Sequence, residues 1–429
     1  MFTKLHPLTI NRIGLAAAIA AAGTFGPTTT AADSAGVTIE PAVAAAPVAL
    51  RPQPAGVETT TVDEPVADLT VPVTASASAQ RLDSPELNGA GPITSPDVGD
   101  HCAEGLGADQ LTAFFAEPIG PFQGADYQRA IRLADDRVLW TFQDAFISGT
   151  LVHNVGMIQS GRCFTLLNSG ARSWLFTDQT SHMHRWHWIL AGTQEPDGSI
   201  HLFVVELNER GAGYLGRTEP TALRRVQLDP ATLGVTAVAD EPIIGVDLYG
   251  WSIVSDDDHT YLYSHCYRQF GFAELLGVDP CAEYVKVARV PRGALDGPRQ
   301  YWSDAGWVDD PSLATPVIDR NLVGATNNPA QIHFDGERFH MIQKRDDWWG
   351  EQLDVAVADN PHGPFVHVTT FDEQRKCELW VCNTYFATWV PWDDTSGASI
   401  WMTSHNRWNG SETASHLHVY RPTFHTLAA

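Results

Sequence analysis

Basic residues are scarce in this chain of 429 residues, where 27 Lys and Arg stand against 51 Asp and Glu, for a formal net charge of −24. So acidic a surface repels phosphate backbones, which excludes nucleic acid as a partner. It also disfavours anionic polymers. A neutral polysaccharide is the easier ligand, with its sugar rings stacked on aromatic faces.

Long apolar runs are missing as well. The apolar run Ile13–Phe25 is too short to cross a bilayer. Two basic residues, Lys4 and Arg12, precede it, and small residues follow it around Ala32. Residues 1–32 therefore predict an export signal. No lipid-anchor cysteine follows it, so we expect a secreted or cell-wall-associated protein that does not span a membrane and is monomeric.

Aromatic residues are almost absent from residues 33–97, which consist largely of Ala, Val, Pro, Thr and Ser. Such a segment cannot bury enough surface to fold alone, and it predicts a disordered linker. All 14 tryptophans and all six cysteines lie in residues 98–429. We expect these residues to form one domain.

Convincing helical periodicity is absent from every long segment of that domain, which predicts an all-β fold. Turn signals recur about 60 residues apart, with one interval nearer 80, and each lies between two strand-like segments. The turns are Asp135-Asp136, Pro196–Gly198, Asp256–Asp258, Asp335-Gly336 and Asp394–Gly397. Five such hairpins predict a five-bladed β-propeller; a β-sandwich is the second choice, because it does not explain the long period.

Six cysteines behind an export signal predict three disulfides. Proximity favours the pairs Cys377–Cys382, Cys266–Cys281 and Cys102–Cys163. A metal site is the competing interpretation, with His182 and His184 on one face of a strand as its candidate ligands. We expect neither a metal nor a cofactor, because no cysteine pair has C-x-x-C spacing and no carboxylate near the histidines has ligand spacing.

Two carboxylates mark the first hairpin. Asp144 lies inside the apolar strand Val138–Phe146, and Asp126 lies 18 residues upstream, so both are expected to face the same side. Paired carboxylates in a cleft are the usual equipment for glycosidic bond cleavage. The alternative is a structural role, in which Asp144 caps a turn or pairs with Arg129.

Equivalent positions in the other blades predict a ring of polar and aromatic side chains around the propeller axis. Counting seven residues on from the residue that follows each turn (Arg137, Ser199, His259, Glu337 and Ala398) gives Asp144, Glu206, Cys266, Lys344 and His405. We take Glu206 as a reserve acid. The predicted substrate contacts are His184, Trp186, His187, Trp251, Asn328, Lys344, Trp348, Trp349, His405 and Asn406. A register error of one residue would turn such side chains to the other face.

The segment Trp140–Phe146, with Asp126 before it, resembles the Phe-Gly-Asp-Thr-Phe segment of the domain of unknown function 4185 group, whose characterised members form glycoside hydrolase family 183. Weaker similarity extends to Gly250–Val254 and Ser404–Asn406. The resemblance implies a five-bladed propeller that hydrolyses internal D-arabinofuranosyl linkages of cell-wall arabinan. It also implies that Asp126 and Asp144 are the essential aspartates.

The expected chemistry is therefore acid/base hydrolysis of an arabinofuranosyl bond, with the roles of the two aspartates open. Analogy with related propeller hydrolases favours inversion, and burial beside Trp140 or Trp251 would raise the pKa of the acid. Two alternatives remain. One is a glycan-binding propeller of the cell envelope without catalysis, and the other is an L-arabinan or xylan side-chain furanosidase of the same architecture.

Overall fold

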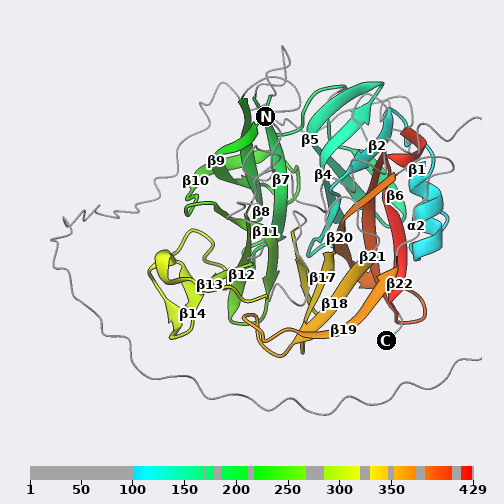
Figure 1. Cartoon of the computed structure of the whole chain (residues 1–429). Helices are drawn as coiled ribbons and strands as arrows, with labels where there is room; N and C mark the ends of the chain where they lie inside the picture. The colour runs from blue at the N-terminus through cyan, green and yellow to red at the C-terminus, as the bar shows by residue number, and fades with distance from the viewer. Residues whose placement is uncertain are drawn as a thin grey trace, which may run out of the picture. The chain divides into compact units, whose positions relative to one another are not determined.

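Five antiparallel β-sheets follow one another along the chain, and each is built from one continuous stretch of sequence. The computed structural model describes residues 101–168, 170–177, 185–210, 217–266, 285–318, 329–345, 352–372, 382–407 and 417–427. The predicted export signal and linker lie outside these residues. Figure 1 shows the sheets arranged around a common centre, and the predicted five-bladed β-propeller is confirmed.

The first sheet, blade 1, contains β1 (His101–Cys102), β2 (Phe122–Asp126), β3 (Arg129–Arg132), β4 (Val138–Ile147), β5 (Thr150–Ser160) and β6 (Cys163–Leu166). Blade 2 contains β7 (Arg185–Gln194), β8 (Ile200–Arg210), β9 (Arg217–Leu228) and β10 (Val235–Glu241). Blade 3 contains β11 (Asp247–Ser255), β12 (His259–Cys266), β13 (Val287–Pro291), β14 (Gln300–Ser303) and β15 (Gly306–Val308).

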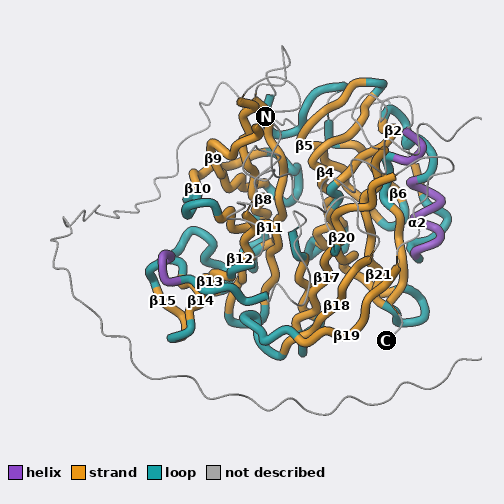
Figure 2. The backbone as a smooth tube through the Cα atoms, in the orientation of Figure 1, coloured by secondary structure: helices purple, strands orange, loops and turns teal. Residues whose placement is uncertain are grey.

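Blade 4 contains β16 (Gln331–Phe334), β17 (Phe339–Lys344), β18 (Gln352–Ala358) and β19 (Val366–Asp372). Blade 5 contains β20 (Cys382–Asp393), β21 (Ser399–Arg407) and β22 (Thr423–Leu427). The helical elements described are α2 (Ala108–Phe115) and the short 3-10 turns η2 (Pro311–Leu313) and η4 (Leu417–Val419). In Figure 2 strands dominate the described chain, and α2 lies at the edge of the molecule.

All five predicted hairpins are present, as the antiparallel pairs β3–β4, β7–β8, β11–β12, β16–β17 and β20–β21. Aspartate fixes several of the turns, because its carboxylate accepts backbone N–H groups that the turn would leave unpaired. Asp335 accepts from the N–H groups of Glu337 and Arg338, and Asp394 accepts from those of Ser396 and Ala398. The turn residues in the sequence thus locate the blades.

Helix α2 was not predicted, since eight residues are too few for a clear periodic signal. Its apolar side chains Leu111 and Phe115 are buried in a core cluster formed by blades 1 and 5. Tertiary burial, rather than helix propensity, therefore stabilises it.

The first and last blades meet at a seam that no shared strand closes, because each blade is made from its own stretch of chain. Hydrogen bonds cross this seam instead. The Thr112 hydroxyl accepts from the Phe424 N–H at 2.9 Å, and Arg421 donates to the Phe115 carbonyl at 3.1 Å. The Ala125 N–H donates to the Tyr420 carbonyl at 2.9 Å. Side-chain packing and these bonds hold the ring closed.

The disulfide Cys102–Cys163 is confirmed, and it joins β1 to β6. Cys266 is disulfide-bonded as well. Cys281, Cys377 and the side chain of Cys382 lie outside the described residues, so the other two predicted pairings stay predictions. Nowhere in the described part of the chain is a helix long and apolar enough to cross a membrane.

Candidate active site

Asp126 and Asp144 lie directly opposite each other on the paired strands β2 and β4. Cross-strand partners of this kind point to the same face of a sheet, with Cβ atoms about 4.5 to 5.5 Å apart. On its other side, Asp144 is paired with His153 of β5. Two carboxyl groups and an imidazole therefore stand in a row across blade 1.

The Asp126 side chain is enclosed at the seam between blades 1 and 5. Only 6% of the residue is exposed, and its Oδ2 accepts a hydrogen bond from the Tyr385 hydroxyl at 2.6 Å. Burial raises the pKa of Asp126 well above its ordinary value, and the neighbouring Asp144 raises it further, against the lowering effect of hydrogen bonds from Tyr385 and Tyr420. Its Oδ1 is buried without a hydrogen-bond partner among the described residues. The surroundings of Asp126 thus favour its protonated form.

Asp144 has a more open setting, with 17% of its side chain exposed. Its Oδ1 is hydrogen-bonded to His153 Nδ1, and it also accepts from the Trp188 indole N–H at 2.7 Å. Both bonds fall on one oxygen, and no described residue bonds to Oδ2. A carboxylate held through one oxygen presents the other to a substrate in a fixed direction.

Aromatic side chains surround the pair. The Tyr127 ring lies parallel to that of Trp188 at 6.4 Å between centroids and contacts Phe386 at 4.8 Å. The Trp186 ring is stacked on His153 at 5.7 Å. Trp186 and Trp188, predicted from the sequence as sugar platforms, are less than 10% exposed. In this structure Trp186 packs against His153, and Trp188 donates a hydrogen bond to Asp144.

Glu206 does not have the environment of a reserve acid. Its Oε2 accepts from both terminal nitrogens of Arg224 at 3.1 Å, and its Oε1 accepts from the Thr221 hydroxyl at 2.8 Å. The contact with His187 is the largest cause that lowers the pKa of Glu206, to about 2. A group that is ionised at every physiological pH cannot donate a proton, so the expected role of Glu206 is withdrawn.

Other predicted contacts are buried within the blades. Trp251 is 1% exposed in the core between blades 2 and 3, and His187 is wholly buried against the Phe176 ring at 4.6 Å. Lys344 is wholly buried and donates to the Arg345 carbonyl at 3.2 Å. His405 is bonded to the hydroxyls of Thr384 and Thr403. All four side chains thus lie inside the blades, and their role as substrate contacts stays a prediction.

Asn406 is half-buried and pairs with Asn383 across β20 and β21. Burial does raise the pKa of Asp126, and the hydroxyl groups that act on its carboxyl group belong to two tyrosines, Tyr385 and Tyr420. The predicted contacts His184, Asn328, Trp348 and Trp349, and the alternative metal ligand His182, lie outside the described residues. Within those residues no cluster of three metal-ligating side chains occurs.

Three residues of the site were missed in the sequence. His153 could have been found, because the Ser148-Gly149 turn folds β5 back along β4 and places it opposite Asp144. Tyr385 and Tyr420 could not have been found from the sequence, because they lie in the last blade and no spacing in the sequence links them to Asp126.

Fold and site together define the protein as a five-bladed propeller whose first blade carries a carboxylate pair in two contrasting environments. The chain belongs to the family called domain of unknown function DUF5005, whose model matches residues 109–427. This match overturns the resemblance to domain of unknown function 4185 and glycoside hydrolase family 183. The first-blade segment, with Gln143 and Ala145 around Asp144, is therefore not a mark of that family.

Solved structures with some likeness include GH43 enzymes and exo-β-1,3-galactanases. A GH43_1 enzyme from Xanthomonas citri in complex with xylose has 13% identity and a TM-score of 0.40, over 71% of this chain and 88% of that one. An exo-β-1,3-galactanase from Phanerochaete chrysosporium has 12% identity and a TM-score of 0.41, and the match covers 71% of this chain and 60% of that one. A GH43 β-xylosidase/α-arabinofuranosidase from a compost metagenome has 14% identity and a TM-score of 0.40, and the match covers 71% of this chain and 91% of that one. These likenesses are too distant to bear on activity, and the curated proteins include no match.

Proposed function

We propose that this protein is a glycoside hydrolase in which Asp126 is the general acid and Asp144 the nucleophile. The observation that supports this most directly is the pairing of two carboxyl groups with opposite surroundings on adjacent strands. Enzymes that cleave glycosidic bonds use one carboxyl group kept protonated and one kept ionised.

The assignment of roles follows from the contacts. Burial and a neighbouring carboxylate favour the protonated form of Asp126, which suits the donor of a proton to the leaving oxygen. Asp144 is held through Oδ1 by the Trp188 indole N–H and by His153, which leaves its Oδ2 directed toward a sugar carbon.

The short separation expected for a directly opposed pair favours retention of configuration. Retaining glycosidases have carboxyl groups about 5 to 5.5 Å apart, whereas inverting ones need about 6.5 to 9.5 Å to admit a water molecule. Directly opposed residues have Cβ atoms only about 4.5 to 5.5 Å apart, which supports a short distance between the two carboxyl groups. We therefore favour a covalent glycosyl-enzyme at Asp144, and we set aside the inversion expected by analogy.

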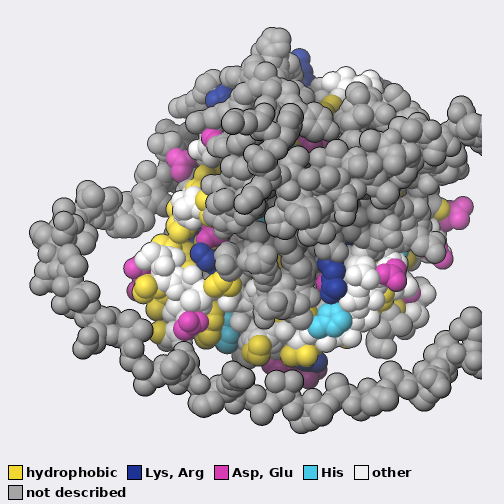
Figure 3. Space-filling model, viewed as in Figure 1, with side chains coloured by type: hydrophobic (Ala, Val, Ile, Leu, Met, Phe, Trp, Pro, Cys, Tyr) yellow, Lys and Arg dark blue, Asp and Glu magenta, His cyan; other side chains and the backbone are white. Residues whose placement is uncertain are grey.

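The substrate we propose is a neutral polysaccharide, because the chain is strongly acidic and acidic side chains are scattered over the described surface in Figure 3. Within that class we propose arabinofuranosyl linkages as the first substrates to test, and more specifically cleavage of internal linkages in D-arabinan. The family match removes the resemblance that suggested it, so L-arabinan and xylan belong in the same assay.

The test is incubation of the full chain with D-arabinan, L-arabinan and xylan, followed by chromatography of the products. We expect oligosaccharides from one polymer, and we expect Asp126→Asn and Asp144→Asn each to reduce turnover at least 1,000-fold, as roughly 4 kcal/mol of lost transition-state stabilisation implies. Asp136→Asn, at an exposed turn of the same hairpin, should retain full activity.

Two further readouts separate the roles. On an aryl glycoside with a good leaving group, Asp126→Asn should recover much of its kcat/KM, since formation of the glycosyl-enzyme no longer needs a proton, while kcat stays low because the base for its hydrolysis is missing; Asp144→Asn should recover neither. Binding of a glycan without products, unaffected by either substitution, would instead indicate a propeller that binds glycans without cleaving them.

A further inference from the structure

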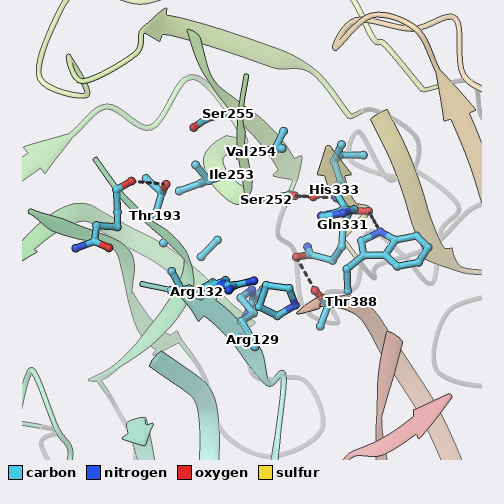
Figure 4. A pocket seen from close by; sticks show the side chains of 18 of the residues that line it. Arg129, Arg132, Thr193, Ser252, Ile253, Val254, Ser255, Gln331, His333 and Thr388 are labelled. Carbon is cyan, nitrogen blue, oxygen red and sulfur yellow. Dashed lines mark hydrogen bonds between the residues drawn. The ribbon is translucent and has the colours of Figure 1, made fainter. Parts of the chain in front are cut away.

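A polar cavity lies among the inner strands of the propeller, toward their C-terminal ends. Its volume is about 360 Å³, and the inner strands of all five blades line it. Lining residues shown in Figure 4 include Arg129 and Arg132 of β3, Thr193 of β7, Ser252 of β11 and Gln331 of β16. On β2 and β3, Asp126 comes three residues before Arg129, so the cavity and the carboxylates lie on opposite sides of Arg129.

The inner wall of this cavity contains a buried cation. Arg129 is 4% exposed, and its guanidinium carbon lies 4.5 Å from the Phe386 ring centroid and 5.7 Å from that of Trp251. Its Nη1 donates to the carbonyls of Tyr127 and Ile189. Nε and Nη2 have no hydrogen-bond partner among the described residues.

These two unpartnered donors form one edge of the guanidinium plane. Two parallel N–H groups on one edge match the two oxygens of a carboxylate or phosphate, which is the geometry of bidentate oxyanion recognition. Burying an arginine without a partner has an unfavourable free energy. A bound anion that accepts from these two N–H groups would offset that cost.

The charges around the cavity agree with an anionic ligand. Although the chain is acidic, none of the described lining residues is Asp or Glu. Arg132 is exposed and is paired with Asp136 at 2.7 Å, and Arg292 of the lining interacts electrostatically with Glu195. Arg129 has no such hydrogen-bonded carboxylate; burial lowers its pKa to about 9, and Asp126 raises it only in part.

We propose that this cavity binds a small oxyanion, of the carboxylate or phosphate class, through the Nε–Nη2 edge of Arg129. Both nitrogens are shielded from solvent in this structure, so the proposal requires the guanidinium to turn toward the cavity when the anion binds. Thr193, Ser252 and Gln331 provide polar groups along its path.

A consequence for catalysis rests on the proposed function. Asp126 and Arg129 interact electrostatically, so the charge on Arg129 opposes protonation of Asp126, and an anion bound to Arg129 would offset that charge. The other groups that act on Asp126, namely Asp144, Tyr385 and Tyr420, are unchanged. Anion binding should therefore favour the protonated acid and extend activity to higher pH.

The test is isothermal titration of the full chain with sodium acetate and, separately, sodium phosphate at constant ionic strength in a zwitterionic buffer. We expect one saturable site for at least one of the two anions. Arg129→Lys keeps the positive charge but removes the pair of parallel N–H donors, and it should weaken anion binding at least tenfold. The control Arg132→Gln, at the exposed rim, should change it less than about threefold.

Should Arg129→Lys fail to fold, Thr193→Trp fills the cavity while leaving Arg129 in place, and it should abolish binding. A crystal soaked in selenate should show the selenium next to Arg129. The proposal is overturned if neither anion binds the wild type saturably, or if Arg129→Lys or Thr193→Trp, when folded, binds as tightly as the wild type. These titrations do not need glycosidase activity, so failure of the proposed function leaves them decisive. Binding without a shift in the pH profile overturns the link to Asp126 alone.

Discussion

Asp126 and Asp144 are the same kind of residue on neighbouring strands, yet their contacts give them different tasks. Two tyrosine hydroxyls and the enclosing seam surround Asp126, whereas an indole N–H and an imidazole hold Asp144. The difference arises from the elements packed against each side chain, since strand position alone makes the two equivalent.

Asp126→Asn should stabilise the fold at neutral pH. The pKa of Asp126 is higher in the folded than in the unfolded state, so the folded state holds a proton more tightly, and wild-type stability falls as the pH rises from about 4 through the raised value. Asparagine is isosteric with the protonated acid and escapes this loss. The melting temperatures of wild type and variant should coincide near pH 3 and separate as the pH rises. A gap that is largest at pH 3 would contradict a raised pKa.

Tyr385→Phe should shift the pH profile of the enzyme. The Tyr385 hydroxyl donates to Asp126 and lowers its pKa, so its removal should raise the pKa of the acid and move the alkaline limb of kcat/KM to higher pH. Tyr420→Phe should move it in the same direction. As a matched control, Tyr261→Phe removes a hydroxyl bonded to Asp256 in blade 3 and should leave the limb in place.

Among the elements, the β8–β9 pair shows why a conspicuous carboxylate need not belong to a site. Glu206 lies at the position in blade 2 that Asp144 holds in blade 1, which is why the sequence suggests it. In the structure Arg224 and Thr221 of β9 bind both of its oxygens. Its neighbour strand, not its place in the repeat, decides its role.

Glu206→Gln should therefore reduce stability and spare catalysis. Replacing the carboxylate weakens charge-assisted hydrogen bonds, at a cost of about 1 to 3 kcal/mol at pH 7. Because the pKa of Glu206 is lowered to about 2, its contribution is fully present above about pH 4.5 and is lost as the pH falls toward 2. Urea unfolding of both proteins at pH 7 and at pH 2.5 measures this, and a large loss of kcat in the folded variant would return Glu206 to the site.

The elements that the sequence predicts well are those specified locally. Turn aspartates and glycines locate all five hairpins, and the strand period brings Asp126 opposite Asp144. The ring of equivalent residues is less well predicted, because Lys344 and His405 are bound by neighbours in their own blades. Tyr385 lies 259 residues from Asp126 in sequence, and its contact is created only by closure of the ring.

The whole molecule depends on the seam between its first and last blades. Thr112 of α2 both accepts from and donates to the backbone of Phe424 across it. Thr112→Val keeps the side-chain shape and removes both bonds, and should cost about 1 to 3 kcal/mol, because the Phe424 N–H loses its partner. Thr112→Ser keeps the hydroxyl and should cost less. Thermal unfolding of the two variants gives the comparison, and equal melting temperatures would show that the seam does not depend on this hydroxyl.

The seam also has a consequence in time. Asp126 is synthesised early, whereas Tyr385 and Tyr420 emerge from the ribosome about 260 and 290 residues later. Until blade 5 docks, the carboxyl group of Asp126 lies open to water, where it is an ordinary ionised aspartate. The surroundings that raise the pKa of Asp126 thus form only when blade 5 docks, so a chain that stalls or misfolds before that step carries both carboxylates without the environment that distinguishes them.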